Sequence, residues 1–146
     1  MSKSPLTRIL GDIAGRLCAL PVLLIHAAAS LVIGRTRSFR ATSEAVSLLP
    51  GPLGTVVRRY VYRALLARCG RGVSIGFGTV LMYRESELGE SVYVGRFCSL
   101  GLTSIGDGTM IGNQVNVISG RHGIELGRPI REQDAQVERV SIGADS

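Results

Sequence analysis

The sequence predicts a mainly β fold, a parallel β-helix of hexapeptide repeats that is preceded by α-helices. Before Gly70, apolar residues form a continuous run or recur at helical spacing. After Val73, glycine follows an aliphatic residue at positions 76, 89, 95, 101, 106 and 112. That aliphatic residue returns about every six positions, at Ile75, Leu81, Leu88, Val94, Leu100, Ile105, Ile111 and Val117.

A period of six residues fits neither a helix nor an alternating strand that continues through tight hairpins. It fits a coil in which each hexad forms one flat side and three hexads complete a turn. We expect each aliphatic side chain to point inward and to stack on its counterpart one coil away, about 4.8 Å along the axis. We also expect the glycines to tolerate the unusual dihedral angles of the corners. One residue is inserted before Leu88 and one is missing after Ser104.

The pattern divides the chain into three segments. Residues 1–40 form a hydrophobic N-terminal helical segment, residues 41–70 a helical connector, and residues 71–146 the hexapeptide β-helix. In the connector, Thr42 or Ser43 is expected to cap a short helix that "PGPLG" then terminates. From Thr55 a second helix has arginines between its apolar residues and is expected to end at Gly70.

The N-terminal segment contains a charge-free run at residues 17–34, bounded by Arg16 and by an arginine cluster that begins at Arg35. At this length it fits a helix that docks on a membrane or dips into it, a buried core helix, or a signal peptide cleaved near "HAAAS". We favour the membrane-docking helix and a cytoplasmic protein that associates with the inner face of the membrane. His26 is expected to be a helix residue near the membrane interface and not a ligand.

Composition narrows the classes of partner. A net charge of +6 suits nucleic acid, an anionic membrane surface, a phosphate-bearing ligand or an ordinary solvated surface. Nucleic acid is disfavoured because neither zinc-ligand spacing nor an aromatic RNA-binding motif accompanies the charge. Three cysteines without CxxC spacing are typical of reduced thiols in a cytosolic protein.

These residues resemble the hexapeptide-repeat acyltransferases, and most closely the bacterial O-acetyltransferases of the xenobiotic and polysaccharide acetyltransferase type. The resemblance covers residues 39–146 through the hexads and "SLLPGPLGTVVRRYVYR", "CGRGVSIGFGT", "ISGRH", "RPIREQ" and "VSIGADS". It implies a left-handed β-helix and a homotrimer with active sites between subunits. It also implies transfer of an acetyl group from acetyl-CoA to a hydroxyl or amine of a saccharide or small molecule, without a metal.

His122 is the candidate catalytic residue. It ends the last uninterrupted hexad and opens a polar segment that leaves the coil before "VSIGADS" resumes the repeat. A neutral imidazole can remove the proton from an acceptor hydroxyl as its oxygen attacks a thioester carbonyl. The alternative is an ordinary exposed loop histidine. Relatives often have a His-x-His arrangement here, whereas Ile124 stands at the second position.

The other site assignments concern substrate and cofactor. Asn116 lies one hexad before His122, on what we expect to be the same side of the coil, and its amide is a candidate to bind an acceptor hydroxyl. The alternative is a corner or stacked asparagine. Arg121 is a candidate to bind an anionic sugar or a CoA phosphate, or else an exposed loop arginine. Backbone groups at Ser141, Gly143 and Ala144 match the region where the family begins to line its pantetheine groove.

Family members continue with further hexads beyond the position of "SIGADS", so we expect this β-helix to be incomplete at its C-terminal end, with an open edge. A second hypothesis is therefore a non-catalytic membrane-associated scaffold or an inactive truncated acyltransferase. A γ-carbonic-anhydrase function needs about three histidines around zinc, and the hexads contain one.

Overall fold

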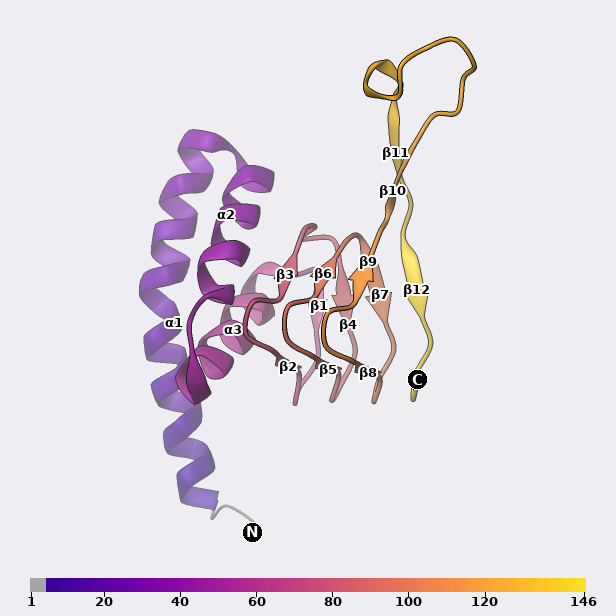
Figure 1. The fold of residues 1–146 in the computed structure, drawn as a ribbon. Coiled ribbons are helices and arrows are strands. Elements are labelled where there is room, and N and C mark those ends of the chain that lie inside the picture. Colours follow the sequence, from indigo (N-terminus) through magenta and orange to yellow (C-terminus); the bar gives the residue numbers. More distant parts are fainter. Residues whose placement is uncertain (1–4) are drawn as a thin grey trace.

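The structure is a computed structural model that describes the backbone of residues 5–146 and the side chains of residue 11 and residues 13–146. Three helices come first, and short strands follow them (Figure 1). The helices are α1 (Pro5–Ile33), α2 (Arg35–Ser47) and α3 (Gly51–Leu65). A β-rich region therefore follows a helical one, as the sequence predicts.

Ten of the strands pair in parallel and form three sheets, with the orders β1-β4-β7-β12, β2-β5-β8 and β3-β6-β9. Consecutive strands belong to different sheets, so the chain passes through the three sheets in rotation, and we call each pass a round. The strands are β1 (Arg68–Cys69), β2 (Ser74–Ile75), β3 (Val80–Leu81), β4 (Glu87–Leu88), β5 (Tyr93–Val94), β6 (Ser99–Leu100), β7 (Thr103–Ile105), β8 (Met110–Ile111), β9 (Asn116–Val117) and β12 (Val140–Ile142).

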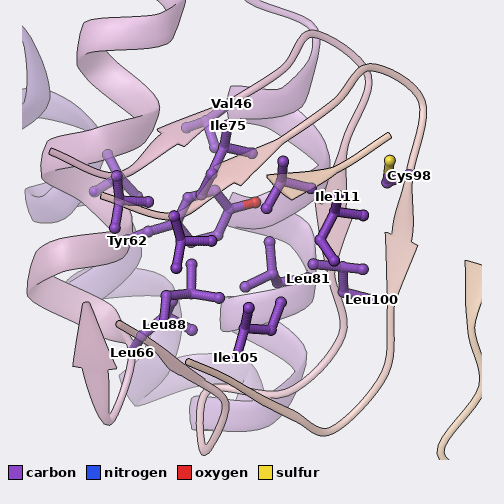
Figure 2. Packing of buried hydrophobic residues seen from close by; sticks show 14 of the residues in the cluster. Val46, Tyr62, Leu66, Ile75, Leu81, Leu88, Cys98, Leu100, Ile105 and Ile111 are labelled. Carbon is purple, nitrogen blue, oxygen red and sulfur yellow. The ribbon is translucent and has the colours of Figure 1, made fainter. Parts of the chain in front are cut away.

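The aliphatic positions of the hexads line the interior. Seven of the eight are buried, and Val117 is partly buried against the same core. Strand register aligns them in three columns: Ile75, Val94 and Ile111; Leu81, Leu100 and Val117; Leu88, Ile105 and Ile142. Figure 2 shows the labelled side chains converging on this interior. The predicted stacking of each aliphatic residue on its counterpart in the next round is confirmed.

The expectation that glycines tolerate unusual dihedral angles at the corners is confirmed at Gly72, Gly78 and Gly108, but it is wrong for the glycines that follow the hexad aliphatic residues. Those at 76, 89, 95, 101, 106 and 112 do not have left-handed φ angles. A Cβ atom on Gly76 would instead overlap the carbonyl group of Gly95, and one on Gly95 would overlap that of Gly112. Glycine is needed where the backbone of the next round approaches closely, whereas a Cβ atom on Gly112 would meet nothing within 4 Å. Left-handed φ angles between the strands of the sheets occur at other residues: Gly72, Gly78, Ser91, Phe97, Gly108, Gln114 and Asp145.

Both connector helices begin earlier than the sequence suggested. α2 starts at Arg35, because Gly34 has a φ of 82° and reverses the chain directly after α1. Ser43 is not a cap; its buried hydroxyl bonds the Tyr62 hydroxyl at 2.7 Å and accepts the backbone N–H of Leu81 at 2.9 Å. α3 starts at Gly51, where Pro52 occupies the first turn and needs no backbone N–H.

α3 also ends earlier than the predicted stop at Gly70. The chain becomes extended at Leu66, and Arg68 and Cys69 pair in parallel with Glu87 and Leu88. Sheet pairing replaces the last helical turn because it supplies backbone hydrogen-bond partners and places Cys69 above Leu88 in the interior column. α2 ends at Ser47, ahead of "PGPLG" as predicted.

α1 packs on both other helices. On the α3 side, Gly15 and Ala19 are buried, and a Cβ atom on Gly15 would overlap Val56 and Tyr60. On the α2 side, the His26 ring bonds the hydroxyl oxygens of Thr42 at 2.9 Å and Ser38 at 3.1 Å. α1 is therefore held against the other helices by one face.

Replacing Gly15 with alanine is expected to destabilise the protein by about 1–3 kcal/mol, because the added methyl group pushes α1 away from α3. Gly11→Ala is the matched control on the same helix, since a Cβ atom there meets nothing within 4 Å. Alanine has the higher helix propensity, so Gly11→Ala is expected to stabilise by up to about 1 kcal/mol. Urea unfolding monitored by circular dichroism measures both changes, and equal effects at the two positions would contradict the close packing.

α1 also contains a segment, Ile13–Ile33, that is long and apolar enough to cross a membrane by length and composition. The core helix of a soluble protein and a signal sequence satisfy the same criteria.

Candidate active site

The candidate site is centred on a hairpin that interrupts the rotation of strands. β10 (Gly120–His122) and β11 (Ala135–Val137) pair antiparallel and project away from the parallel sheets (Figure 1). β12 then returns to the parallel arrangement, with Val140 opposite Thr103 on β7. The departure before "VSIGADS" follows the prediction, but it begins at Gly120. His122 is therefore part of the hairpin and not the end of a hexad strand.

The His122 side chain is exposed, and His122 lies opposite Ala135 in the hairpin register. Among the described residues, no hydrogen bond or ion pair engages its ring. A neutral imidazole has one donor nitrogen and one acceptor nitrogen. Both are accessible to a substrate or to a neighbouring chain.

The loop at the tip of the hairpin is ordered by Gln133, which is only 8% exposed. Its Oε1 accepts the backbone N–H of Glu125 at 2.9 Å. Its Nε2 donates to the carbonyl oxygens of Glu125 at 3.0 Å and Arg128 at 2.8 Å. A short 3-10 helix, Ile130–Glu132, precedes it. No sequence pattern indicates this role, because a glutamine among polar loop residues is commonplace.

Arg121 forms an ion pair across the hairpin with Glu138, at 3.4 Å. Both side chains are 70% exposed, so the pair contributes no more than about 1 kcal/mol to stability. The guanidinium is thus partly engaged by a carboxylate, and its remaining N–H groups face solvent. An anionic ligand would compete with Glu138 for Arg121.

The prediction that Asn116 lies on the same side of the coil as His122 is wrong. It is on β9, where it stands opposite Ser99 in the β3-β6-β9 sheet, and it is exposed. His122 is on the antiparallel hairpin because the chain leaves this sheet after Val117. Asn116 is therefore in a parallel sheet, and His122 is in the antiparallel hairpin.

A cavity of about 200 Å³ lies between this sheet and the base of the hairpin. Tyr83, Ser99, Ile118 and Gly120 are among its lining residues. The guanidinium of Arg40, from α2, lies 5.6 Å from the centre of the Tyr83 ring. Sequence reasoning missed Tyr83 and Arg40, because only the packing of α2 against the β region brings them together.

Ser141, Gly143 and Ala144 are exposed, on and directly after β12. Ser141 lies opposite Ser104, and the Gly143 carbonyl accepts a hydrogen bond from the Thr109 hydroxyl at 2.6 Å. Among the described residues, no hydrogen bond or ion pair joins these positions to His122. Within one chain, the predicted cofactor residues and the predicted base remain separate.

Three other side chains with ionisable or nucleophilic groups, those of Tyr62, Cys69 and Cys98, pack in the interior, whereas Cys18 is exposed. Burial raises the pKa of Cys69 to about 11 and that of Tyr62 to about 12, so neither ionises readily near neutral pH. Cys98 is buried, and its Sγ donates to the carbonyl of Gly112 at 3.1 Å. Within the described part of the chain, no group of three His, Cys, Asp or Glu side chains is arranged to hold a metal ion.

No protein-family model matches the chain, and neither a curated protein nor a solved structure matches it.

Proposed function

We propose that the protein is an O-acetyltransferase that uses acetyl-CoA as donor and a saccharide or small molecule with a hydroxyl (or amine) as acceptor. The observation that carries the proposal is an exposed histidine on a hairpin that interrupts three parallel sheets of stacked hexads. The resemblance of the hexads to the hexapeptide-repeat acyltransferases supplies the chemistry, since a fold alone does not specify a reaction.

The proposed architecture is a left-handed parallel β-helix. Parallel register between successive rounds and the three aliphatic columns support it. In this arrangement the hairpin is an insertion between β9, which ends the third round, and β12, which begins the fourth, and a cavity of about 200 Å³ lies beside its base.

In the proposed reaction, His122 is the general base. Its neutral imidazole takes the proton of the acceptor hydroxyl while the hydroxyl oxygen forms a bond to the thioester carbonyl carbon. The C–S bond then breaks, and the proton passes from the imidazolium to the departing CoA thiolate. In the proposal, Ser99 and Asn116 orient the acceptor, and Ser141, Gly143 and Ala144 of another subunit hold the pantetheine arm.

A homotrimer would bring these groups together, because one chain keeps His122 and Ser141–Ala144 apart. The hairpin supports such an assembly, since Ile124 and Leu126 are 93% and 100% exposed and Ile130 is 64% exposed. Apolar side chains at the tip of a projecting hairpin are suited to packing against another subunit. A cytoplasmic location, where acetyl-CoA is made, is part of the proposal.

Isothermal titration calorimetry of the purified full chain with acetyl-CoA tests the proposal. We expect saturable binding, and light scattering is expected to give three times the 15.5 kDa chain mass. Release of free CoA thiol in the presence of hydroxyl acceptors would then identify the acceptor class. A folded chain that does not bind acetyl-CoA would contradict the proposal and favour the non-catalytic scaffold.

A further inference from the structure

α1 presents an apolar surface to solvent. We call this surface the ridge and define it by Leu17, Leu20, Leu24, Ile25, Leu31 and Val32. Their exposed fractions run from 49% at Leu20 to 90% at Leu31. At 100° per residue, Leu17, Leu20, Leu24 and Leu31 lie on one side of the helix and the buried Gly15 and Ala19 on the other. Figure 1 shows α1 at the edge of the molecule, away from the sheets.

The ridge extends for roughly 23 Å at a rise of 1.5 Å per residue. A helix that is apolar on all sides belongs in a protein core or against lipid, and large exposed apolar patches mark interaction sites. α1 packs on α2 and α3 by one face only, so the ridge requires a partner outside the described fold.

Charge around the ridge indicates an anionic partner. Residues 1–66 contain nine basic and two acidic residues, a net charge of +7, whereas residues 67–146 contain eight basic and nine acidic residues. Every ion pair of the described side chains involves an arginine from Arg68 onward. No described carboxylate lies within ion-pair distance of Arg16, Arg35, Arg37 or Arg63.

A groove beside the ridge combines apolar surface with positive charge. It lies between α1 and α3, has a volume of about 440 Å³, and is lined by Leu20 and Leu23 together with Arg16 and Arg63. An apolar floor with two guanidinium groups suits a molecule with an acyl chain and a phosphate. Phospholipids have this chemistry.

The packing of α1 argues against its crossing the membrane. α2 and α3 lie along it, and their exposed residues include Arg37, Glu44 and Arg63. If α1 crossed the bilayer, these side chains would enter the hydrocarbon core, where charges are strongly disfavoured. A second copy of the chain is also disfavoured as the partner of the ridge, because residues 1–66 of each copy carry a net charge of +7 and the two segments would repel each other.

We propose that the ridge lies in the plane of an anionic phospholipid surface, with its apolar side chains below the headgroups and Arg16, Arg35, Arg37 and Arg63 bound to lipid phosphates. This inference does not depend on acetyl transfer, and its test involves no enzymatic activity.

Co-sedimentation of the full chain with phosphatidylcholine vesicles, with and without phosphatidylglycerol, is the test. We expect strong binding to the anionic vesicles and weaker binding at high salt. Leu24→Gln is expected to weaken binding roughly fivefold to tenfold, because a buried leucine is lost from the lipid phase. Met110→Gln is the matched control and should leave binding unchanged, since Met110 is 69% exposed and Leu24 68%.

The charge contribution is tested by Arg35→Gln with Arg37→Gln, which is expected to weaken binding to anionic vesicles about tenfold or more. Arg71→Gln with Arg131→Gln removes the same charge from side chains that are 81% and 84% exposed in the β region, and should have little effect.

Three results would overturn the inference. The first is no binding to anionic vesicles. The second is binding that resists both high salt and alkaline carbonate, as for a spanning helix, and the third is a change of oligomeric mass in Leu24→Gln without vesicles.

Discussion

His122→Ala is expected to lower the rate of acetyl transfer by about a hundredfold to ten-thousandfold, the usual contribution of a general base. The side chain is exposed and makes no hydrogen bond or ion pair with the described residues, so its removal should leave the fold and stability unchanged. Acetyl-CoA binding should also persist, because Ser141, Gly143 and Ala144 lie on and directly after β12, outside the hairpin that contains His122. Initial rates of CoA thiol release and the thermal midpoint measure the two effects.

A structural role for His122 is separated from a catalytic one by chemical rescue. Added imidazole can replace the missing base and is expected to restore part of the activity of His122→Ala. It should not change the activity of Arg121→Ala, the control on the same strand, because imidazole does not replace a guanidinium that pairs with Glu138. Full activity in His122→Ala would exclude the histidine as base.

Arg58→Ala is expected to destabilise the protein by about 3–5 kcal/mol. The Arg58 side chain is 1% exposed. It donates to the carbonyl oxygens of Ile75 at 2.9 Å, Val46 at 3.2 Å and Leu49 at 2.7 Å. Its loss removes these hydrogen bonds and leaves a cavity, and a buried acceptor left without a partner costs about 1–3 kcal/mol; the Val46 carbonyl keeps the backbone N–H of Leu49 at 3.3 Å. Urea unfolding measures the change, which is a large share of a typical stability of 5–15 kcal/mol.

Two further variants separate geometry from charge at Arg58. Burial lowers the pKa of Arg58. The carbonyl groups at the C-terminal end of α2 oppose this effect because they stabilise the positive charge of the guanidinium. Lysine keeps the charge but has no planar fork of donors, so Arg58→Lys should recover only part of the loss. Arg63→Ala, on the exposed side of α3, should have almost no effect. If Arg58→Ala were equally mild, the three hydrogen bonds would not link the helices to the sheets.

The interior of the β region could be predicted from sequence because the hexad repeats it many times. Ile75, Val94 and Ile111 stack as expected, since one period determines every column. The role of the glycines could not be predicted, because a left-handed turn and a close approach of two backbones both select glycine. Only the position of Gly95 above Gly76 distinguishes them.

The contacts that join the helices to the β region had no local signal. Ser43 meets Tyr62 and Leu81, and Arg58 meets Ile75, across large separations in the sequence. A serine in "ATSE" resembles a helix cap, and an arginine in a basic helix resembles a solvated one. The cap prediction for Ser43 is wrong because tertiary contacts outweigh local preference.

At the candidate site, the sequence singled out His122 by its place where the repeat stops. It could not give the strand that contains the histidine, because antiparallel pairing with Ala135 depends on residues beyond the loop. Gln133 was missed for the same reason, since its partners are the backbone groups of Glu125 and Arg128.

The return of β12 to β7 has a consequence for how this protein can vary. Val140, Ser141 and Ile142 continue the same register on Thr103, Ser104 and Ile105 that the earlier rounds follow without an insertion. Closing a longer loop adds only slowly to the entropy lost on folding, about 0.6 kcal/mol for each doubling of length. The hairpin can therefore lengthen or shorten while the rounds beneath it stay unchanged.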